Sequence, residues 1–209
     1  MRKRKTKTGK QSISEAAADF LFAELDADYQ TWSKSYELPA FISNNLNKTK
    51  RLRLYQTEAV KRFIYLFEHE RSAAAHWLFN MATGSGKTLV MAACVLYLYE
   101  QGYRNFLFLV NQTQIKDQAK KCLTEYKYSK YLFNPNGVKF CGRKVEVHTV
   151  ERLQDASPYG INFLFFSTPL LYNRLNKKSE NALALDDFIA DTDKDKNKRG
   201  LTSLRVIFS

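Results

Sequence analysis

The chain has 209 residues and a formal net charge of +12, with 44% hydrophobic and 14% aromatic residues. This composition predicts a globular protein with a core and excludes a disordered one, and the length allows one α/β domain with a short extension. No apolar stretch approaches the ~20 residues that cross a bilayer, and no secretory signal follows the first residues. We therefore expect a cytoplasmic protein with no membrane partner.

The positive charge suits a polyanionic partner such as nucleic acid, although a solvated basic surface accounts for it equally well. Three cysteines, Cys94, Cys122 and Cys141, form an odd set without C-x-x-C spacing. They predict buried, reduced thiols rather than disulfides or a zinc site. No histidine cluster indicates a metal centre.

The first 50 residues are predicted to be a basic tail followed by a helical N-terminal extension. Six Lys and Arg residues without an acid occupy the first ten positions, which is typical of a solvated tail. Ser12 and Glu15 have capping-box spacing, and apolar residues then recur at helical intervals, so we expect a helix from about Ser14 to Leu25. Residues 51–209 are predicted to form the main domain.

A second helix is predicted up to about Glu70, because apolar side chains from Ala59 to Phe67 recur with helical spacing. Its start carries the string Leu-Arg-Leu-Tyr-Gln, which ends at Gln56. A glutamine at a helix start is an ordinary helix cap when taken alone.

A phosphate-binding loop is the strongest motif in the chain. An apolar run from Ala75 to Met81 predicts a strand, and a helical pattern begins at Leu89. Between them, glycines allow backbone N–H groups to approach phosphate oxygens at a helix N-terminus, where the helix dipole favours an anion. The candidate nucleotide-binding residues here are Ala82, Thr83, Gly84, Ser85, Gly86, Lys87 and Thr88. Lys87 would contact the phosphates, and Thr88 would bind Mg²⁺.

The string Met-Ala-Thr-Gly-Ser-Gly-Lys-Thr resembles motif I of superfamily 2 helicases and translocases, although Met81 stands where the general pattern has glycine. It is most similar to the motor subunits of type I and type III restriction enzymes, and above all to the type III Res subunit. The resemblance implies a RecA-like ATPase domain at residues 51–209 that uses ATP and Mg²⁺, with Lys87 as its catalytic residue. It also implies that Gln56 reads adenine, with Arg53 and Tyr55 beside the nucleotide.

Beyond the loop, the chain alternates helical and strand patterns, which predicts a mostly parallel sheet. The predicted helices run to Glu100, with a C-cap at Gln101-Gly102, from Ile115 to about Tyr128, and over 184–190. The predicted strands are Asn105 to Val110, Val145 to Val150, Ile161 to Phe166 and Leu204 to Phe208, with a turn at Asn134 to Gly137.

Two strand ends resemble the motifs Ia and Ib that contact the bound nucleic-acid strand in this superfamily. The candidate contacts to the DNA backbone are Asn111, Gln112, Lys116, Thr168 and Pro169. A surface strand–helix loop without a ligand is the alternative for each residue.

Between Thr88 and Ser209 no acidic pair directly follows an apolar strand, although such a pair holds Mg²⁺ and positions water in phosphate-loop motors. We therefore expect a domain that ends at the motif II strand and barely hydrolyses ATP by itself. The family implies further C-terminal motor and nuclease parts and a modification/specificity subunit as partners. The favoured function is the ATP-binding part of a restriction-type DNA translocase. The alternatives are a DEAD-box-type RNA helicase domain and a non-catalytic nucleotide-binding fragment.

Overall fold

The computed structural model describes residues 26–69, 78–167 and 203–205. It divides into a smaller unit, residues 1–37, and a larger one, residues 38–209. In the smaller unit residues 26–35 are helical, and Trp32 stacks on Tyr36 with ring centroids 4.0 Å apart. The helices predicted at 14–25 and 184–190 lie outside the described residues, and the boundary predicted after residue 50 stays a prediction.

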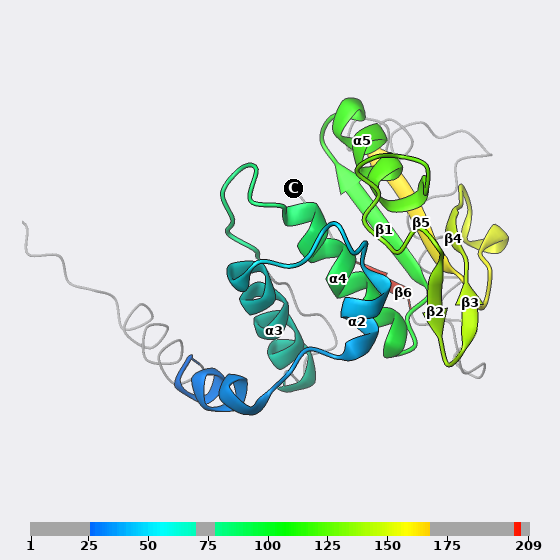
Figure 1. Cartoon of the computed structure of the whole chain (residues 1–209). Helices are drawn as coiled ribbons and strands as arrows, with labels where there is room; N and C mark the ends of the chain where they lie inside the picture. The colour runs from blue at the N-terminus through cyan, green and yellow to red at the C-terminus, as the bar shows by residue number, and fades with distance from the viewer. Residues whose placement is uncertain (1–25, 70–77, 168–202, 206–209) are drawn as a thin grey trace, which may run out of the picture. The chain divides into compact units, whose positions relative to one another are not determined.

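The larger unit mixes helices and strands (Figure 1). Its helices are α2 (Ala40–Asn45), α3 (Leu54–His69), α4 (Lys87–Glu100), α5 (Thr113–Thr124) and the 3₁₀ turn η1 (Leu153–Asp155). Its strands are β1 (Asn105–Val110), β2 (Val138–Phe140), β3 (Arg143–Val145), β4 (Val147–Thr149), β5 (Ile161–Ser167) and β6 (Ser203–Arg205). Within the described ranges, none of the helices combines the length and apolarity of a membrane span.

The main sheet has the strand order β4-β5-β1-β6, and each of its pairings is parallel. The predicted parallel sheet is therefore confirmed, as are β1 and β5 and the described part of the last predicted strand. Strands covered on both faces read as continuous apolar runs, which is why these two were recognisable. Alternate residues form two distinct layers. Phe106 packs against Phe163 and Phe108 against Phe165 on one face, while Leu107 and Leu164 join a core cluster on the other.

Helix α4 is buried around nearly its whole circumference, which explains its almost continuous apolar sequence. It packs against α3 and α2, which lie with it on one side of β1 in Figure 1. Tyr97 of α4 makes edge-to-face contacts with Phe63 and Phe67 of α3. Both α3 and α4 end within one residue of the predicted position. Helix α4 ends at Glu100 with Gln101 as its C-cap, and Gly102 follows with positive φ.

The strand predicted over Val145 to Val150 is confirmed only in part, because the chain changes partner at Glu146. Val145 ends β3, which pairs antiparallel with β2, whereas β4 begins at Val147 and pairs parallel with β5. The carbonyl of Glu146 accepts a hydrogen bond from the Ile161 N–H at 2.9 Å. Two short strands on either side of one residue share the same alternation, so periodicity alone joins them.

Two further predictions differ from the structure. Helix α5 ends at Thr124 rather than Tyr128, since the chain turns at Glu125 and the next exposed Tyr and Lys residues offer no apolar face to bury. The strand predicted before the glycine loop is absent from its described part, residues 78–81. Leu78 there is 90% exposed, which is incompatible with a central strand. The predicted turn at 134–137 is confirmed by the Gly137 N–H to Asn134 carbonyl hydrogen bond, 2.9 Å.

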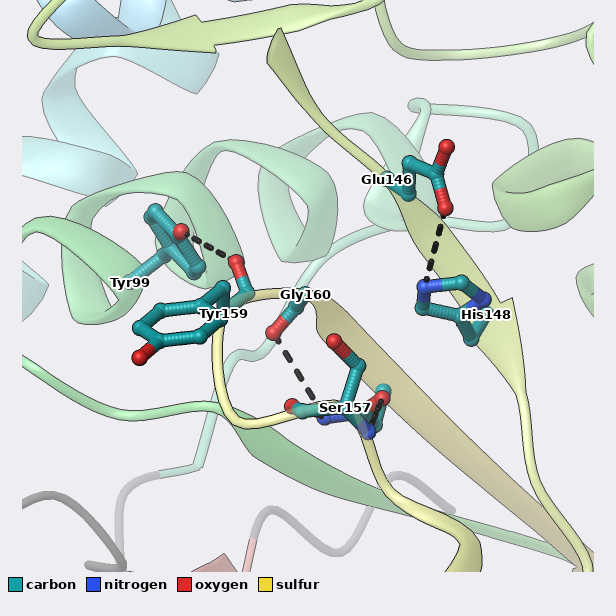
Figure 2. A network of polar contacts seen from close by, with 7 residues as sticks. Tyr99, Glu146, His148, Ser157, Tyr159 and Gly160 are labelled. Atoms are coloured by element: carbon teal, nitrogen blue, oxygen red, sulfur yellow. Dashed lines mark hydrogen bonds and ion pairs between the residues drawn. The ribbon is translucent and has the colours of Figure 1, made fainter. Parts of the chain in front are cut away.

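A polar cluster fixes the loop that leads into β5 (Figure 2). Asn162 is completely buried, and its Oδ1 accepts from the Ser157 N–H at 2.9 Å while its Nδ2 donates to the Ser157 carbonyl at 2.8 Å. The Tyr99 hydroxyl of α4 donates to the Tyr159 carbonyl at 2.7 Å, as Figure 2 shows. Beside them, His148 Nε2 lies 3.5 Å from the Glu146 carboxylate. These bonds tie the amino end of β5 to α4 and β4.

Candidate nucleotide-binding site

The glycine-rich loop forms a tight turn that leads directly into α4. Gly84 and Gly86 have φ of 78° and 83°, a left-handed conformation that side chains other than glycine disfavour. Gly86 is the N-cap of α4 and has no side-chain hydrogen bond to cap the helix. Its carbonyl accepts from the Leu89 N–H at 2.9 Å, so the helix begins without a break after the loop.

The start of α4 presents polar groups that have no partner in the part of the chain that the structure describes. Among the described residues, no acceptor is found for the backbone N–H groups of Gly86, Lys87 and Thr88. The buried hydroxyl of Ser85 also has no hydrogen-bond partner there. Unpaired donors at a helix N-terminus are the arrangement that binds anions in proteins, and the helix dipole adds to it. The loop therefore fits a phosphate group.

The Lys87 side chain folds back over the loop. Its Nζ donates to the carbonyls of Met81 at 2.6 Å and of Ala82 at 3.2 Å. The Ala82 carbonyl also accepts from the Ser85 N–H at 3.2 Å, which closes the turn. The ammonium group is thus held inside the loop by neutral acceptors. A phosphate oxygen would be a stronger acceptor for this cation.

Two side chains from the start of α3 hold the loop from the other side. The Tyr55 hydroxyl and Gln56 Nε2 both donate to the carbonyl of Ser85, each at 2.8 Å. Gln56 is buried, with 4% of its surface exposed, and its Oε1 accepts from the Arg53 N–H at 2.9 Å. The structure therefore brings the predicted residues of the Gln string and of the glycine loop together across a separation of 29 to 30 positions.

The contact between the two segments is close. A Cβ atom added at Gly86 would overlap Gln56 Nε2, so a larger residue at position 86 would force the Gln56 side chain to move. Two effects therefore favour glycine at position 86: its positive φ and the Gln56 side chain packed against it. Tyr55 remains 44% exposed, and the Arg53 side chain is exposed, so both can still contact a ligand.

Thr88 is the predicted magnesium ligand and lies in the first turn of α4, partly exposed. Across the described residues, no group of three or more His, Cys, Asp or Glu side chains is placed to hold a metal ion.

The candidate nucleic-acid contacts follow β1 and β5. Val110 pairs with Ser167, so the two strands end side by side at the carboxyl edge of the sheet. Asn111 and Gln112 are exposed there, and Lys116 lies 3.8 Å from Asp117. Thr168 and Pro169 fall outside the described residues. Because α4 precedes β1 through a four-residue connection and runs back along it, the glycine loop lies at this same end in Figure 1.

The cysteines take no part in this arrangement. Burial raises the pKa of the thiols of Cys94 and Cys122, so both stay protonated and inert, as the sequence predicts. Cys141 contradicts that prediction, since it is exposed at the two-residue turn between β2 and β3 with φ of 49°. Gly142 after it also has positive φ, and glycine is typical of this turn position, whereas cysteine at the first position is not, so the sequence gives only half of the usual hairpin signal.

Sequence reasoning also missed how the site is held together. It assigned Ser85 and Gln56 separately to the nucleotide, but not the hydrogen bond between them. The carbonyls of Met81 and Ala82 as acceptors for Lys87 were missed as well. Backbone acceptors leave no trace in residue identity, so no sequence signal could have revealed them.

Comparison with known proteins places these features in a family. The family model described as "Type III restriction enzyme, res subunit" matches residues 49–192. The probable type III restriction-modification enzyme HindVIP Res subunit of Haemophilus influenzae is 34% identical over 162 residues, covering 73% of this chain and 30% of that protein. The chain thus spans less than a third of the length of this curated relative. No solved structure matches significantly.

Proposed function

Because the chain belongs to the type III restriction enzyme Res subunit family, we propose that it forms the ATP-binding part of a DNA-translocating motor with a RecA-like fold. The observation that carries this proposal is the pair of hydrogen bonds that the Ser85 carbonyl accepts. There the start of α3, with Tyr55 and Gln56, is bonded to the loop that caps α4. These two hydrogen bonds bring the Gln56 amide, which is suited to a base, and the glycine-rich loop, which is suited to phosphate, into one site.

The phosphate end of the site consists of the loop and the first turn of α4. The unpaired N–H groups of Gly86, Lys87 and Thr88 converge with the helix dipole, and the Ser85 hydroxyl adds a further donor. With ATP bound, Lys87 Nζ would contact phosphate oxygens in place of the Met81 and Ala82 carbonyls. The exchange replaces neutral acceptors by charged ones, which strengthens each hydrogen bond.

The base end of the site is the amide of Gln56. Within the described residues, the amide forms two hydrogen bonds that use one N–H and one lone pair, which leaves one donor and one acceptor position. A purine with an amino group beside a ring nitrogen presents the matching acceptor and donor. Because the Gln56 side chain is fixed at both ends, base recognition involves little loss of side-chain freedom.

Mg²⁺ would neutralise charge on the phosphates and help to align them for transfer of the γ-phosphoryl group to water. Thr88 would supply one oxygen ligand to the ion. Lys87 would stabilise the charge that develops on the transferred group, and for this reason we assign it a catalytic role.

The proposal extends to partners. We assign DNA backbone contacts to Asn111, Gln112 and Lys116 at the carboxyl edge of the sheet, and to Thr168 and Pro169. A complete Res-type protein would add further motor and nuclease parts and a modification/specificity subunit, and would act in the cytoplasm. The relative's description as a restriction-modification enzyme supports this assignment.

Removal of the Lys87 ammonium group tests the proposal. We expect Lys87→Ala to weaken ATP binding by roughly 10- to 100-fold, since a hydrogen bond to a charged group contributes ~1.5–3 kcal/mol. Titration calorimetry with ATP and Mg²⁺ measures the affinity. Lys121→Ala, which removes an exposed lysine of α5, should leave it unchanged and serves as the charge-matched control. Equal affinity in wild type and Lys87→Ala would contradict the assignment of the loop.

A further inference from the structure

A second polar surface lies outside the candidate nucleotide site, where α2 ends beside β2 and the 134–137 turn. A hollow of about 410 Å³ opens there, and its lining includes Phe41, Asn44, Lys48, Asn136 and Lys139. Apart from Phe41, these side chains are exposed, and they carry two ammonium groups and two amides. No hydrogen bond from the side chains of Asn44 or Asn136 is found among the described residues.

The walls of the hollow are fixed by a buried asparagine. Asn45 has 3% of its surface exposed, and its Oδ1 accepts from the Lys139 N–H at 2.7 Å. Its Nδ2 donates to the carbonyls of Phe41 at 2.9 Å and Lys139 at 3.1 Å, and its own carbonyl accepts from the Asn134 N–H at 2.8 Å. Helix α2, strand β2 and the turn therefore hold one geometry without a ligand.

The charge around the hollow is of one sign. Lys139 lies directly opposite Lys144 in the β2–β3 hairpin, so the two ammonium stems share a face. Like charges in this position destabilise a hairpin unless an anion lies between or above them. The Lys144 stem lies over Gly137, where an added Cβ would stand 2.7 Å from its Cε, so Lys144 extends toward the turn that borders the hollow.

The three lysines lack an acidic partner in the described segments. In the part of the chain that the structure describes, Lys48, Lys139 and Lys144 form no ion pair with a carboxylate. The nearest acid in sequence, Glu146, instead lies 3.5 Å from His148. Internal neutralisation therefore does not explain why these charges gather at one place.

We propose that Lys48, Lys139 and Lys144, with the amides of Asn44 and Asn136, form a second contact surface for the phosphate backbone of DNA. The proposal rests on the DNA partner of the proposed function and adds to it a surface built by α2 and the hairpin, separate from the strand ends of β1 and β5. Lysines and amides donate hydrogen bonds to phosphate oxygens without reading bases. This surface would therefore hold the duplex in position and be indifferent to its sequence.

The test compares two triple variants of the 209-residue chain with equal charge loss. The surface variant removes the three positive charges of the proposed surface through Lys48→Gln, Lys139→Gln and Lys144→Gln. Lys34→Gln, Lys121→Gln and Lys127→Gln remove three other exposed lysines and form the control. Fluorescence anisotropy with a short labelled duplex of arbitrary sequence measures affinity between ~0.05 and ~0.2 M salt.

For the surface variant we expect the slope of log affinity against log salt to flatten by ~0.9 for each lost phosphate contact, or about 2–3 in all. The control variant should change this slope by less than ~0.9, the value expected for one phosphate contact. A single variant, Lys139→Arg, keeps the charge and should retain wild-type binding. Equal losses in the two triple variants, or no duplex binding by the unmodified chain at ~0.05 M salt, would overturn the proposal.

ATP affinity, measured on the same proteins, separates this proposal from the proposed function. If both triple variants bind ATP like wild type and the surface variant loses DNA, both proposals are supported. If ATP binds and the surface variant keeps its DNA slope, only the second surface is contradicted. If the unmodified chain fails to bind ATP while the surface variant loses DNA, only the nucleotide assignment is contradicted.

Discussion

At position 86, a methyl group in place of the glycine hydrogen would disturb the contact between α3 and the glycine-rich loop. The left-handed φ of 83° disfavours a Cβ, and Gln56 Nε2 occupies the space where that atom would lie. Gly84 has a similar φ of 78°, but its added Cβ would meet nothing within 4 Å. The two glycines therefore allow the conformational effect and the contact effect to be separated.

We expect Gly84→Ala to lower the free energy of unfolding by ~1–2 kcal/mol through its backbone conformation alone. Gly86→Ala should lower it further, because Gln56 must also move. Urea denaturation measures both values. Adding Gln56→Ala to Gly86→Ala should recover part of the extra loss, since the contact no longer exists. Equal losses in the two single variants would show that Gln56 does not lie against Gly86.

Residue identities indicated which residues form the candidate site but not the hydrogen bonds between them, and their binding of a nucleotide stays a prediction. Gly84, Gly86 and Lys87 were recognisable because few residue types can serve a phosphate loop, and Gln56 because a string precedes the loop by one helix. The Ser85 carbonyl, which joins them, has the same chemistry in every residue. Its role depends on three-dimensional position alone, and sequence reasoning therefore could not assign it.

At the scale of elements, the amino end of β5 depends on one buried amide. Asn162 Nδ2 also lies 3.0 Å from Asn105 Oδ1 of β1, so its side chain connects the two central strands as well as the Ser157 loop. Its neighbours in the strand are apolar, and the sequence pattern reads it as an ordinary strand residue. An asparagine within a continuous apolar run was the available signal, because a buried amide must find partners.

Asn162→Ala should lower the free energy of unfolding by ~2–3 kcal/mol, because buried donors and acceptors lose their partners. Asn162→Asp should lower it further at neutral pH, since a carboxylate cannot donate to the Ser157 carbonyl and would be buried. Thermal or urea denaturation provides the measurement. Asn111→Ala, at an exposed position after β1, is the control and should change stability by less than ~0.5 kcal/mol. A neutral Asn162→Ala would contradict the role of the cluster.

Elements were predicted well where burial is uniform and poorly where the chain changes partner. The strands β1 and β5 are covered on both faces, and α4 is buried around its circumference. Their sequences are therefore almost continuously apolar, and no exposed face has to be identified. At Glu146 the partner changes from β2 to β5 within one residue. The alternation of apolar and polar residues continues through Glu146, so it gives no sign of the change of partner. For this reason β3 and β4 were predicted as one strand.

At the scale of the whole molecule, burial of ionisable groups links stability to pH. Burial raises the pKa of Tyr131 to about 12, while an unfolded tyrosine titrates near 10. Below pH 10 the Tyr131 hydroxyl keeps its proton in both the folded and the unfolded state, so its contribution to the free energy of unfolding is fully present. Between pH 10 and about 12 the unfolded state loses its proton first, so the free energy of unfolding falls as pH rises.

Tyr131→Phe should therefore make the decline of stability over this pH range less steep. Urea denaturation of wild type and variant at a series of alkaline pH values measures the difference in slope. Tyr126→Phe removes a hydroxyl from a side chain that is 61% exposed and should leave the slope unchanged. The same slope in wild type and Tyr131→Phe would show that Tyr131 is not buried in the native state.

The parallel order of the main sheet governs how the chain folds during synthesis. Asn105 at the start of β1 pairs with Asn162 and with Ser203, so both partners of the central strand are made later than the strand itself. At ~5–20 residues per second, β1 waits roughly 3–11 s for β5 and roughly twice as long for β6. Throughout that interval β1 is an apolar strand whose two edges lack their native partners, which is the kind of segment that can pair with other chains.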